Sequence, residues 1–75
     1  MKLEELIGNI LDLNPTELTD DLTQSAVQSW DSLAHINIIM ALEEVYGVTF
    51  STEEIPTVKS LGDVRRLLRM KGVAI

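Results

Sequence analysis

The sequence predicts an all-α fold: a four-helix bundle with a long first loop and a short third helix. Apolar residues recur at spacings of three and four, which is the period of a helix with one buried face. Prolines and glycines separate the segments that show this period. No alternating strand pattern is found. The chain has only 75 residues, so we expect residues 1–75 to form a single domain.

The first helix is predicted over residues 2–12, KLEELIGNILD. Its apolar residues lie on one side: Leu3, Leu6, Ile7, Ile10 and Leu11. The pair Asn14-Pro15 should end it, because proline disfavours helical geometry in the residue before it. Residues 13–28 mix polar residues with isolated leucines and predict a long loop that has at most a turn of helix. Loops of this length are uncommon in compact domains and are often functional.

The second helix is predicted to begin near Asp31 and to stop near Gly47, since glycine commonly ends helices. At about 100° per residue it has two apolar sides. The side expected to face the core holds Ile38, Leu42, Val45 and Tyr46, with Ile39 at its edge. The opposite side holds Leu33, Ile36, Asn37 and Met40, bordered by Glu43 and Glu44.

Two apolar sides are one more than a surface helix needs. Burial all round is the alternative, but it would enclose Asn37, Glu43 and Glu44 without evident partners. The second side is therefore predicted to be an exposed apolar patch bordered by carboxylates, which is typical of a site that docks other proteins.

Two further helices complete the prediction. The pattern SxxE at Ser51 and Glu54 is a capping box, which should open a short third helix that Pro56 ends. The fourth helix should start between residues 57 and 60 and stop at Gly72. Its apolar side holds Leu61, Val64, Leu67 and Leu68, and its other sides hold Arg65, Arg66, Arg69 and Lys71.

The net charge of −6 is unevenly distributed, because residues 3–58 hold eleven acids and neither lysine nor arginine. Such a surface repels a phosphate backbone, so we expect basic partners and no nucleic acid. Without cysteine the chain can form no disulfide or thiolate metal site. No signal peptide or membrane-spanning run is evident, so a cytoplasmic monomer without membrane association is expected.

Ser32 lies in the first turn of the second helix, where unpaired N–H groups and the helix dipole favour a phosphate. Its alternative role is as the helix cap, although Ser29 or Asp31 could cap equally well. A hydrolytic dyad of Ser32 with His35 lacks a third orienting group. His35 is expected to be a partly buried structural residue. With one histidine and no cysteine, no metal site is predicted.

The segments WDSLAHINIIMALEEVYGV and FSTEEIPTVKSLGDV resemble acyl carrier proteins, the carriers to which phosphopantetheine is attached. The resemblance implies that a phosphopantetheinyl transferase esterifies Ser32 with 4′-phosphopantetheine from coenzyme A. Acyl groups would then be carried as thioesters, with Asp31 orienting the serine and the metal bound by the transferase. The partner-binding residues would be Leu33, Ile36, Asn37, Met40, Glu43 and Glu44. They would meet basic patches on acyl-loading ligases, synthases and acyltransferases.

The sequence differs from fatty-acid carriers of this kind at several positions. Ser29 replaces the usual glycine, Trp30 precedes the aspartate, and Ala34 and Asn37 stand where acids are common. These differences favour a carrier of a polyketide or other specialised pathway. Such a carrier is not itself an enzyme. An aminoacyl or peptidyl carrier is one alternative. A non-covalent helical adaptor, in which Ser32 is only a cap, is another, and it should tolerate alanine there at about 1 kcal/mol.

Overall fold

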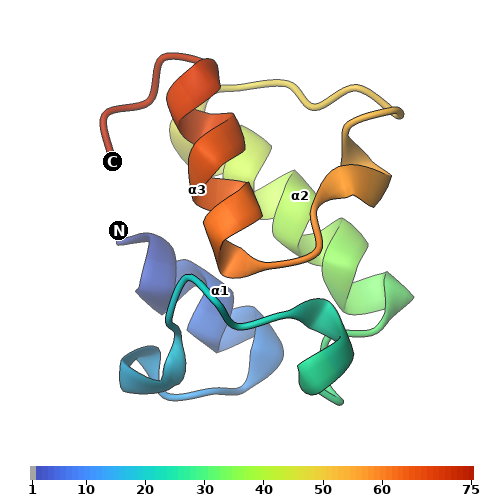
Figure 1. Cartoon of the computed structure of the whole chain (residues 1–75). Helices are drawn as coiled ribbons and strands as arrows, with labels where there is room; N and C mark the ends of the chain where they lie inside the picture. The colour runs from blue at the N-terminus through green and yellow to red at the C-terminus, as the bar shows by residue number, and fades with distance from the viewer. Residues whose placement is uncertain (1) are drawn as a thin grey trace.

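The computed structural model describes residues 2–75, which contain three α-helices and three short 3-10 turns (Figure 1). The helices are α1 (Leu3–Leu11), α2 (Ser32–Tyr46) and α3 (Leu61–Met70). The turns are η1 (Pro15–Glu17) and η2 (Gln24–Ala26) in the first loop, and η3 (Ile55–Thr57) before α3. The described residues form no strand, and an isolated bridge joins Thr23 to Ser60. None of the helices among residues 2–75 is long and apolar enough to span a membrane.

The all-α prediction is confirmed, but residues 2–75 hold three α-helices and not four, because the predicted short third helix does not form as an α-helix. The capping box that suggested it does form: Ser51 N–H donates to Glu54 Oε1 at 2.9 Å, and Glu54 N–H donates to Ser51 Oγ at 3.2 Å. It opens only a turn that continues into η3. Pro56 has no N–H to donate to the next α-helical bond, so the segment continues only as η3 and ends at Val58, whose backbone is extended.

Helix α1 ends at Leu11, earlier than Asn14-Pro15 would require, because Asp12 adopts the left-handed conformation with φ 58°. The chain then turns back on the helix, and Leu13 N–H donates to the Gly8 carbonyl at 2.9 Å. A Cβ at Gly8 would lie 2.7 Å from the Leu13 carbonyl oxygen. The glycine therefore permits the close approach by which the first loop leaves the helix.

The core lies between the three helices and the first loop. Its members are Leu3, Leu6, Ile7, Leu11, Leu18, Trp30, Ala34, Ile38, Ile39, Leu42, Phe50, Val58, Leu61, Val64, Leu67 and Leu68. Leu18 pins the loop to the core, as the isolated leucines suggested. Val45 was predicted to face the core but does not belong to it, because 45% of the residue is exposed. Tyr46, also predicted to face the core, is half-buried.

The segment 20–24 of the first loop is tied to the start of α3 by backbone hydrogen bonds. Gly62 N–H donates to the Asp20 carbonyl at 2.8 Å, and Leu61 N–H to the Leu22 carbonyl at 3.0 Å. Gln24 N–H donates to the Lys59 carbonyl at 2.7 Å. A Cβ at position 62 would meet the Asp20 carbonyl oxygen at 2.9 Å, so only glycine allows this approach.

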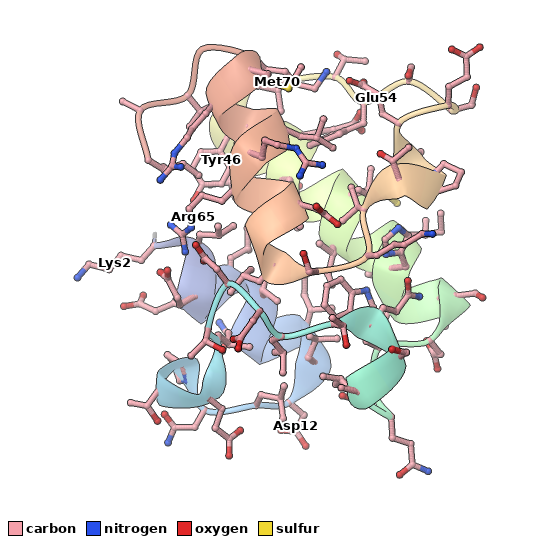
Figure 2. All side chains as sticks on the ribbon, viewed as in Figure 1. Lys2, Asp12, Tyr46, Glu54, Arg65 and Met70 are labelled. Carbon is pink, nitrogen blue, oxygen red and sulfur yellow. The ribbon has the colours of Figure 1, made fainter. Side chains whose placement is uncertain are left out.

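Most basic residues in and directly after α3 form ion pairs with acids of the same chain. Arg65 lies between α3 and α1 (Figure 2) and contacts Glu4 at 2.6 Å and Asp20 at 3.0 Å. Arg66 pairs with Asp63 at 2.9 Å within the helix. Lys71 pairs with Glu54 at 2.9 Å and lies over the Phe50 ring, 5.2 Å from its centroid.

These contacts lower the pKa of three carboxyl groups. The side-chain hydrogen bond from Arg65 lowers the pKa of Glu4. The backbone N–H of Ser51, assisted by Lys71, lowers the pKa of Glu54. The backbone N–H of Lys59 lowers the pKa of Asp63. Each carboxylate is therefore stabilised in its charged form by the fold.

Candidate functional site

The cap of α2 is Asp31 rather than Ser32. The Asp31 backbone is extended, and its Oδ1 accepts a hydrogen bond from Ala34 N–H at 2.8 Å. Its carbonyl accepts the first helical bond, from His35 N–H, at 2.9 Å. Ser32 is thus the first residue inside the helix and is exposed to solvent. Its hydroxyl is not needed to cap the helix.

The start of α2 fits a phosphate ester on Ser32. The first N–H groups of a helix have no partner inside it, and the helix dipole adds a partial positive charge there. Asp31 satisfies the amides of Ala34 and His35. Among the hydrogen bonds of residues 2–75, the amides of Ser32 and Leu33 have no protein acceptor. Both amides lie within one residue of the Ser32 hydroxyl and could bind phosphate oxygens.

An apolar strip follows Ser32 along the outer side of α2. Leu33 is 70% exposed, Ile36 44% and Met40 61%. Asn37 and Glu44 are exposed beside them. We call Leu33, Ile36, Asn37 and Met40 the docking face, because an exposed apolar patch that starts at the candidate attachment residue is typical of a protein-binding site.

Glu43 has a different environment from the one that the sequence suggested. Its Oε2 accepts a hydrogen bond from Phe50 N–H at 2.8 Å, and the side chain is part-buried. The carboxylate thereby fixes the segment that follows Gly47, where α2 ends in the left-handed conformation. Of the two carboxylates next to the docking face, Glu44 is thus the one that lies fully at the surface.

Trp30 and His35 lie on either side of Asp31 and Ser32 and are buried in the molecule. Trp30 is only 2% exposed and His35 8%. The indole Nε1–H donates to His35 Nδ1 at 3.0 Å, and the ring planes are inclined by 28° with centroids 6.1 Å apart. His35 Nε2 lies 2.9 Å from the carbonyl oxygen of Ile55 in η3. His35 is structural, as expected, but it is buried more completely and hydrogen-bonded on both ring nitrogens.

The Trp30–His35 pair was missed in the sequence, although a local signal for it exists. With Asp31 as the cap, Trp30 is the residue before the cap and His35 is the fourth residue of the helix. Large side chains at these two positions commonly pack together in a hydrophobic staple, which sets the angle at which the chain enters the helix. The spacing could have identified the pair once the cap was known.

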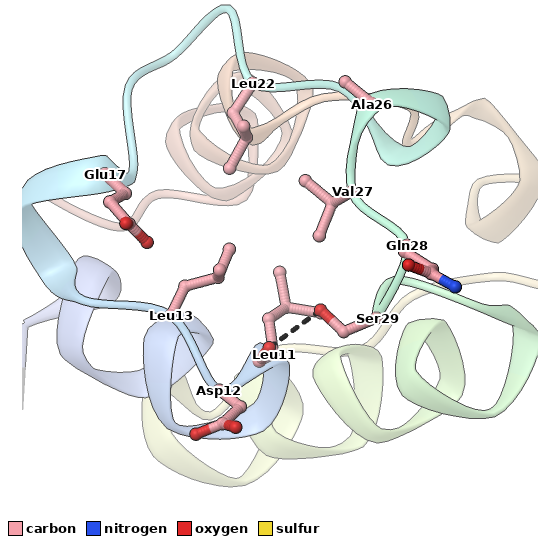
Figure 3. Close-up of a pocket in the computed structure, with 9 residues that line it drawn as sticks. All are labelled: Leu11, Asp12, Leu13, Glu17, Leu22, Ala26, Val27, Gln28 and Ser29. Atoms are coloured by element: carbon pink, nitrogen blue, oxygen red, sulfur yellow. Dashed lines mark hydrogen bonds between the residues drawn. The ribbon is translucent and has the colours of Figure 1, made fainter.

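A hollow of about 650 Å³ lies beside the residues that precede α2 (Figure 3). Ser29 stands at one side of it, and its Oγ donates to the Leu11 carbonyl at 2.7 Å. This bond joins the segment before α2 to the end of α1. The other lining residues come from the end of α1 and the first loop: Leu11, Asp12, Leu13, Glu17, Leu22, Ala26, Val27 and Gln28.

Comparison with known proteins gives a consistent result. Residues 2–68 match the family described as "Phosphopantetheine attachment site". The chain is 36% identical over 70 residues to polyketide-8 synthase acyl carrier protein 2 of Streptomyces avermitilis, covering 93% of this chain and 80% of that protein. It is 29% identical over 73 residues to the acyl carrier protein of Thermosynechococcus vestitus, covering 97% and 90% respectively.

Solved structures of carriers share the fold. The holo acyl carrier protein of Nitrosomonas europaea superposes with a TM-score of 0.79 at 27% identity, over 92% of this chain and 89% of that one. The holo acyl carrier protein of Geobacter metallireducens gives 0.74 at 26% identity, over 97% and 91%. The chain belongs to the phosphopantetheine attachment site family, as an acyl carrier protein whose cofactor is covalently attached 4′-phosphopantetheine.

Proposed function

We propose that the Ser32 hydroxyl is the attachment point of the cofactor. The observation that carries the proposal is the division of roles at the start of α2. Asp31 caps the helix, so the exposed hydroxyl of Ser32 is available next to two amides that can bind a phosphate. The arm supplies the thiol on which acyl groups are carried as thioesters, and the chain itself contains no cysteine. The chain acts as a carrier and not as an enzyme.

Asp31 has a second role in this proposal. Its Oδ1 is held by the Ala34 amide, which fixes the carboxylate one residue from the Ser32 hydroxyl. A carboxylate in this place can orient the serine towards a transferase and contribute to binding the transferase's metal ion. Oxygen ligands of this type are the ones that Mg²⁺ prefers.

The docking face is proposed as the surface shared by the partner enzymes. These are the phosphopantetheinyl transferase, an acyl-loading ligase or synthase, and acyltransferases. Leu33, Ile36 and Met40 provide apolar contacts, and exposed Glu44 provides a negative charge beside them. Several partners that use one face in turn need fast association and weak binding, which small apolar contacts with electrostatic steering provide.

The pathway is proposed to be a fatty-acid-like, polyketide or other specialised biosynthetic pathway. The similarity to a polyketide carrier at 36% identity supports it, as do Ser29 and Trp30 before the attachment serine. An aminoacyl or peptidyl carrier is the alternative within the same chemistry. The acidic, cysteine-free composition supports a cytoplasmic setting.

The test is the intact mass of the protein after incubation with coenzyme A, Mg²⁺ and a promiscuous phosphopantetheinyl transferase. Wild type should gain one phosphopantetheine, and Ser32→Ala should gain none. The nearest other serine provides the control, because Ser29→Ala removes a hydroxyl that bonds to Leu11 and should still be loaded. An adduct on Ser32→Ala would contradict the assignment of the residue.

The rival function is a non-covalent adaptor that uses the docking face alone. Absence of an adduct on folded wild type, with a known carrier loaded in the same tube, would refute the carrier function and favour the adaptor. Because Asp31 is the cap, Ser32→Ala should change the free energy of unfolding by only about 0.5 kcal/mol or less. The two functions are therefore separated by the adduct and not by stability.

A further inference from the structure

The buried hydrogen bond between Trp30 and His35 lies directly beneath the start of α2. It closes a ring around the attachment residue, because the two partners are five residues apart and Asp31 and Ser32 lie between them. The chain in this ring is also fixed by Asp31, which binds the amides of Ala34 and His35. The backbone on both sides of Ser32 is thus held by the side chains of Trp30 and His35, which are almost fully buried.

The hydrogen bonds assign the protonation state of His35. An indole N–H can only donate, so His35 Nδ1 must be the unprotonated acceptor. The remaining proton is then on Nε2, which donates to the Ile55 carbonyl at 2.9 Å. His35 is therefore neutral, and its tautomer is set by its two partners. No side-chain polar atom buried among residues 2–75 is left without a hydrogen-bond partner.

The second bond of His35 connects the site to another part of the fold. Ile55 begins η3, which follows the turn opened by the capping box of Ser51 and Glu54. The imidazole therefore joins three segments: the residues before α2, the first turn of α2 and η3. A purely apolar staple would set the entry angle of the chain but would not fix its direction towards η3.

We propose that Trp30 and His35 are positioning residues for the transfer of phosphopantetheine to Ser32. They act through the backbone, by holding residues 31 and 32 in the direction that presents the serine hydroxyl to the transferase. The proposal rests on the proposed attachment at Ser32. Displacement of a reacting group by about 1 Å can cost up to about a hundredfold in rate, so a modest loss of order at this position is measurable.

The experiment measures the steady-state rate of loading by a phosphopantetheinyl transferase, with coenzyme A saturating and the carrier concentration varied. Trp30→Phe keeps an aromatic ring and removes the N–H donor. We expect kcat to fall about tenfold with KM for the carrier unchanged, because the docking face is intact. A control variant, Val64→Ala, truncates a buried residue of α3 and lowers the thermal midpoint without removing either hydrogen bond.

A pair of substitutions at His35 separates hydrogen bonding from packing. His35→Asn retains an oxygen that can accept from the indole but loses the donor to the Ile55 carbonyl, so its loading rate should lie between those of wild type and Trp30→Phe. His35→Leu removes the acceptor and should match Trp30→Phe. As a spectroscopic signature, the ¹⁵N spectrum of the wild-type imidazole should show the Nε2–H tautomer.

The outcomes decide between the possibilities. Loading of Trp30→Phe at the wild-type rate, or an equal loss in Val64→Ala, would show that the pair only stabilises the fold and would overturn the proposal. An Nδ1–H tautomer would overturn it as well. If wild type itself is not loaded while a known carrier is, the proposed function fails first and the positioning role fails with it. Loading of wild type together with unchanged variants removes the positioning role alone.

Discussion

The role of Asp31 as the cap of α2 allows its structural and chemical contributions to be separated. Asp31→Ala removes the acceptor of the 2.8 Å hydrogen bond from Ala34 N–H. Loss of such a cap costs about 1 kcal/mol, and for a domain of this size that corresponds to a fall of about 4–8 °C in Tm. Asp31→Asn keeps an acceptor oxygen and loses only the favourable charge at the helix start, which is about 0.3 kcal/mol at an exposed position.

Thermal unfolding followed by circular dichroism measures both variants, and the mass-based loading assay is run on the same samples. We expect Asp31→Asn to be nearly as stable as wild type but to load as slowly as Asp31→Ala, since both lack the carboxylate. Equal destabilisation of the two variants would refute the cap as the source of the stability. Wild-type loading of Asp31→Asn would refute a need for the negative charge.

Three further predictions concern the rest of the molecule. The folded pKa values of three carboxyls lie below their ordinary values, so their contribution to stability is complete above the unfolded pKa and is lost as pH falls. The urea midpoint should therefore drop between about pH 5 and 3, and less steeply in Glu4→Gln, which cannot titrate against Arg65. Gly62→Ala places a Cβ 2.9 Å from the Asp20 carbonyl oxygen, and it should lower the free energy of unfolding by about 1–3 kcal/mol, measured with urea. Met40→Lys removes an exposed apolar contact and opposes the charge of Glu44, so Tm should stay within about 3 °C while KM for loading rises at least about fivefold, and an unchanged KM would remove Met40 from the docking face.

The sequence predicted the parts of the fold that depend on neighbouring residues. The limits of α2 followed from local signals, and the helix does run from the residue after Asp31 to the residue before Gly47. The capping box at Ser51 and Glu54 was also identified correctly. Its consequence was overestimated, because a capping box stabilises only the first turn, and Pro56 cannot donate the next α-helical bond, so only the 3-10 turn η3 follows.

Contacts between distant segments could not be predicted from the pattern alone. A helical wheel placed Val45 on the core side of α2, but nothing in the fold covers this last turn of the helix enough to bury it. Glu43 looked like a surface carboxylate until the chain after Gly47 returned and gave it the amide of Phe50. The basic last helix was unexplained because the acids that pair with Arg65 lie in α1 and the first loop.

The sequence suggested the exposed residues of the candidate site but not the buried contacts beneath them. Ser32 and the docking face were singled out from their positions on one helix, and Asp31 from the resemblance to acyl carrier proteins. The bond between Trp30 and His35 required two side chains to face inward together and a third segment, η3, to supply a carbonyl. Residues that act through buried contacts between distant segments are hard to identify from the sequence. Exposed apolar residues on one side of a helix are easier to identify, because they break the expected pattern of one apolar face.

The attachment of the first loop to α3 bears on how variants of this protein can be made. The hydrogen bonds that hold residues 20–24 in place run between backbone groups of the loop and of residues 59–62. Apart from Leu22 and from Asp20, whose carboxylate pairs with Arg65, side chains in this stretch are therefore not what fixes its path. Libraries that randomise Asp21, Thr23 and Gln24 while retaining Gly62 should yield a large fraction of folded carriers. The loop is consequently a suitable place to engineer new partner preferences by substitution, whereas an insertion would shift the backbone groups that make these bonds.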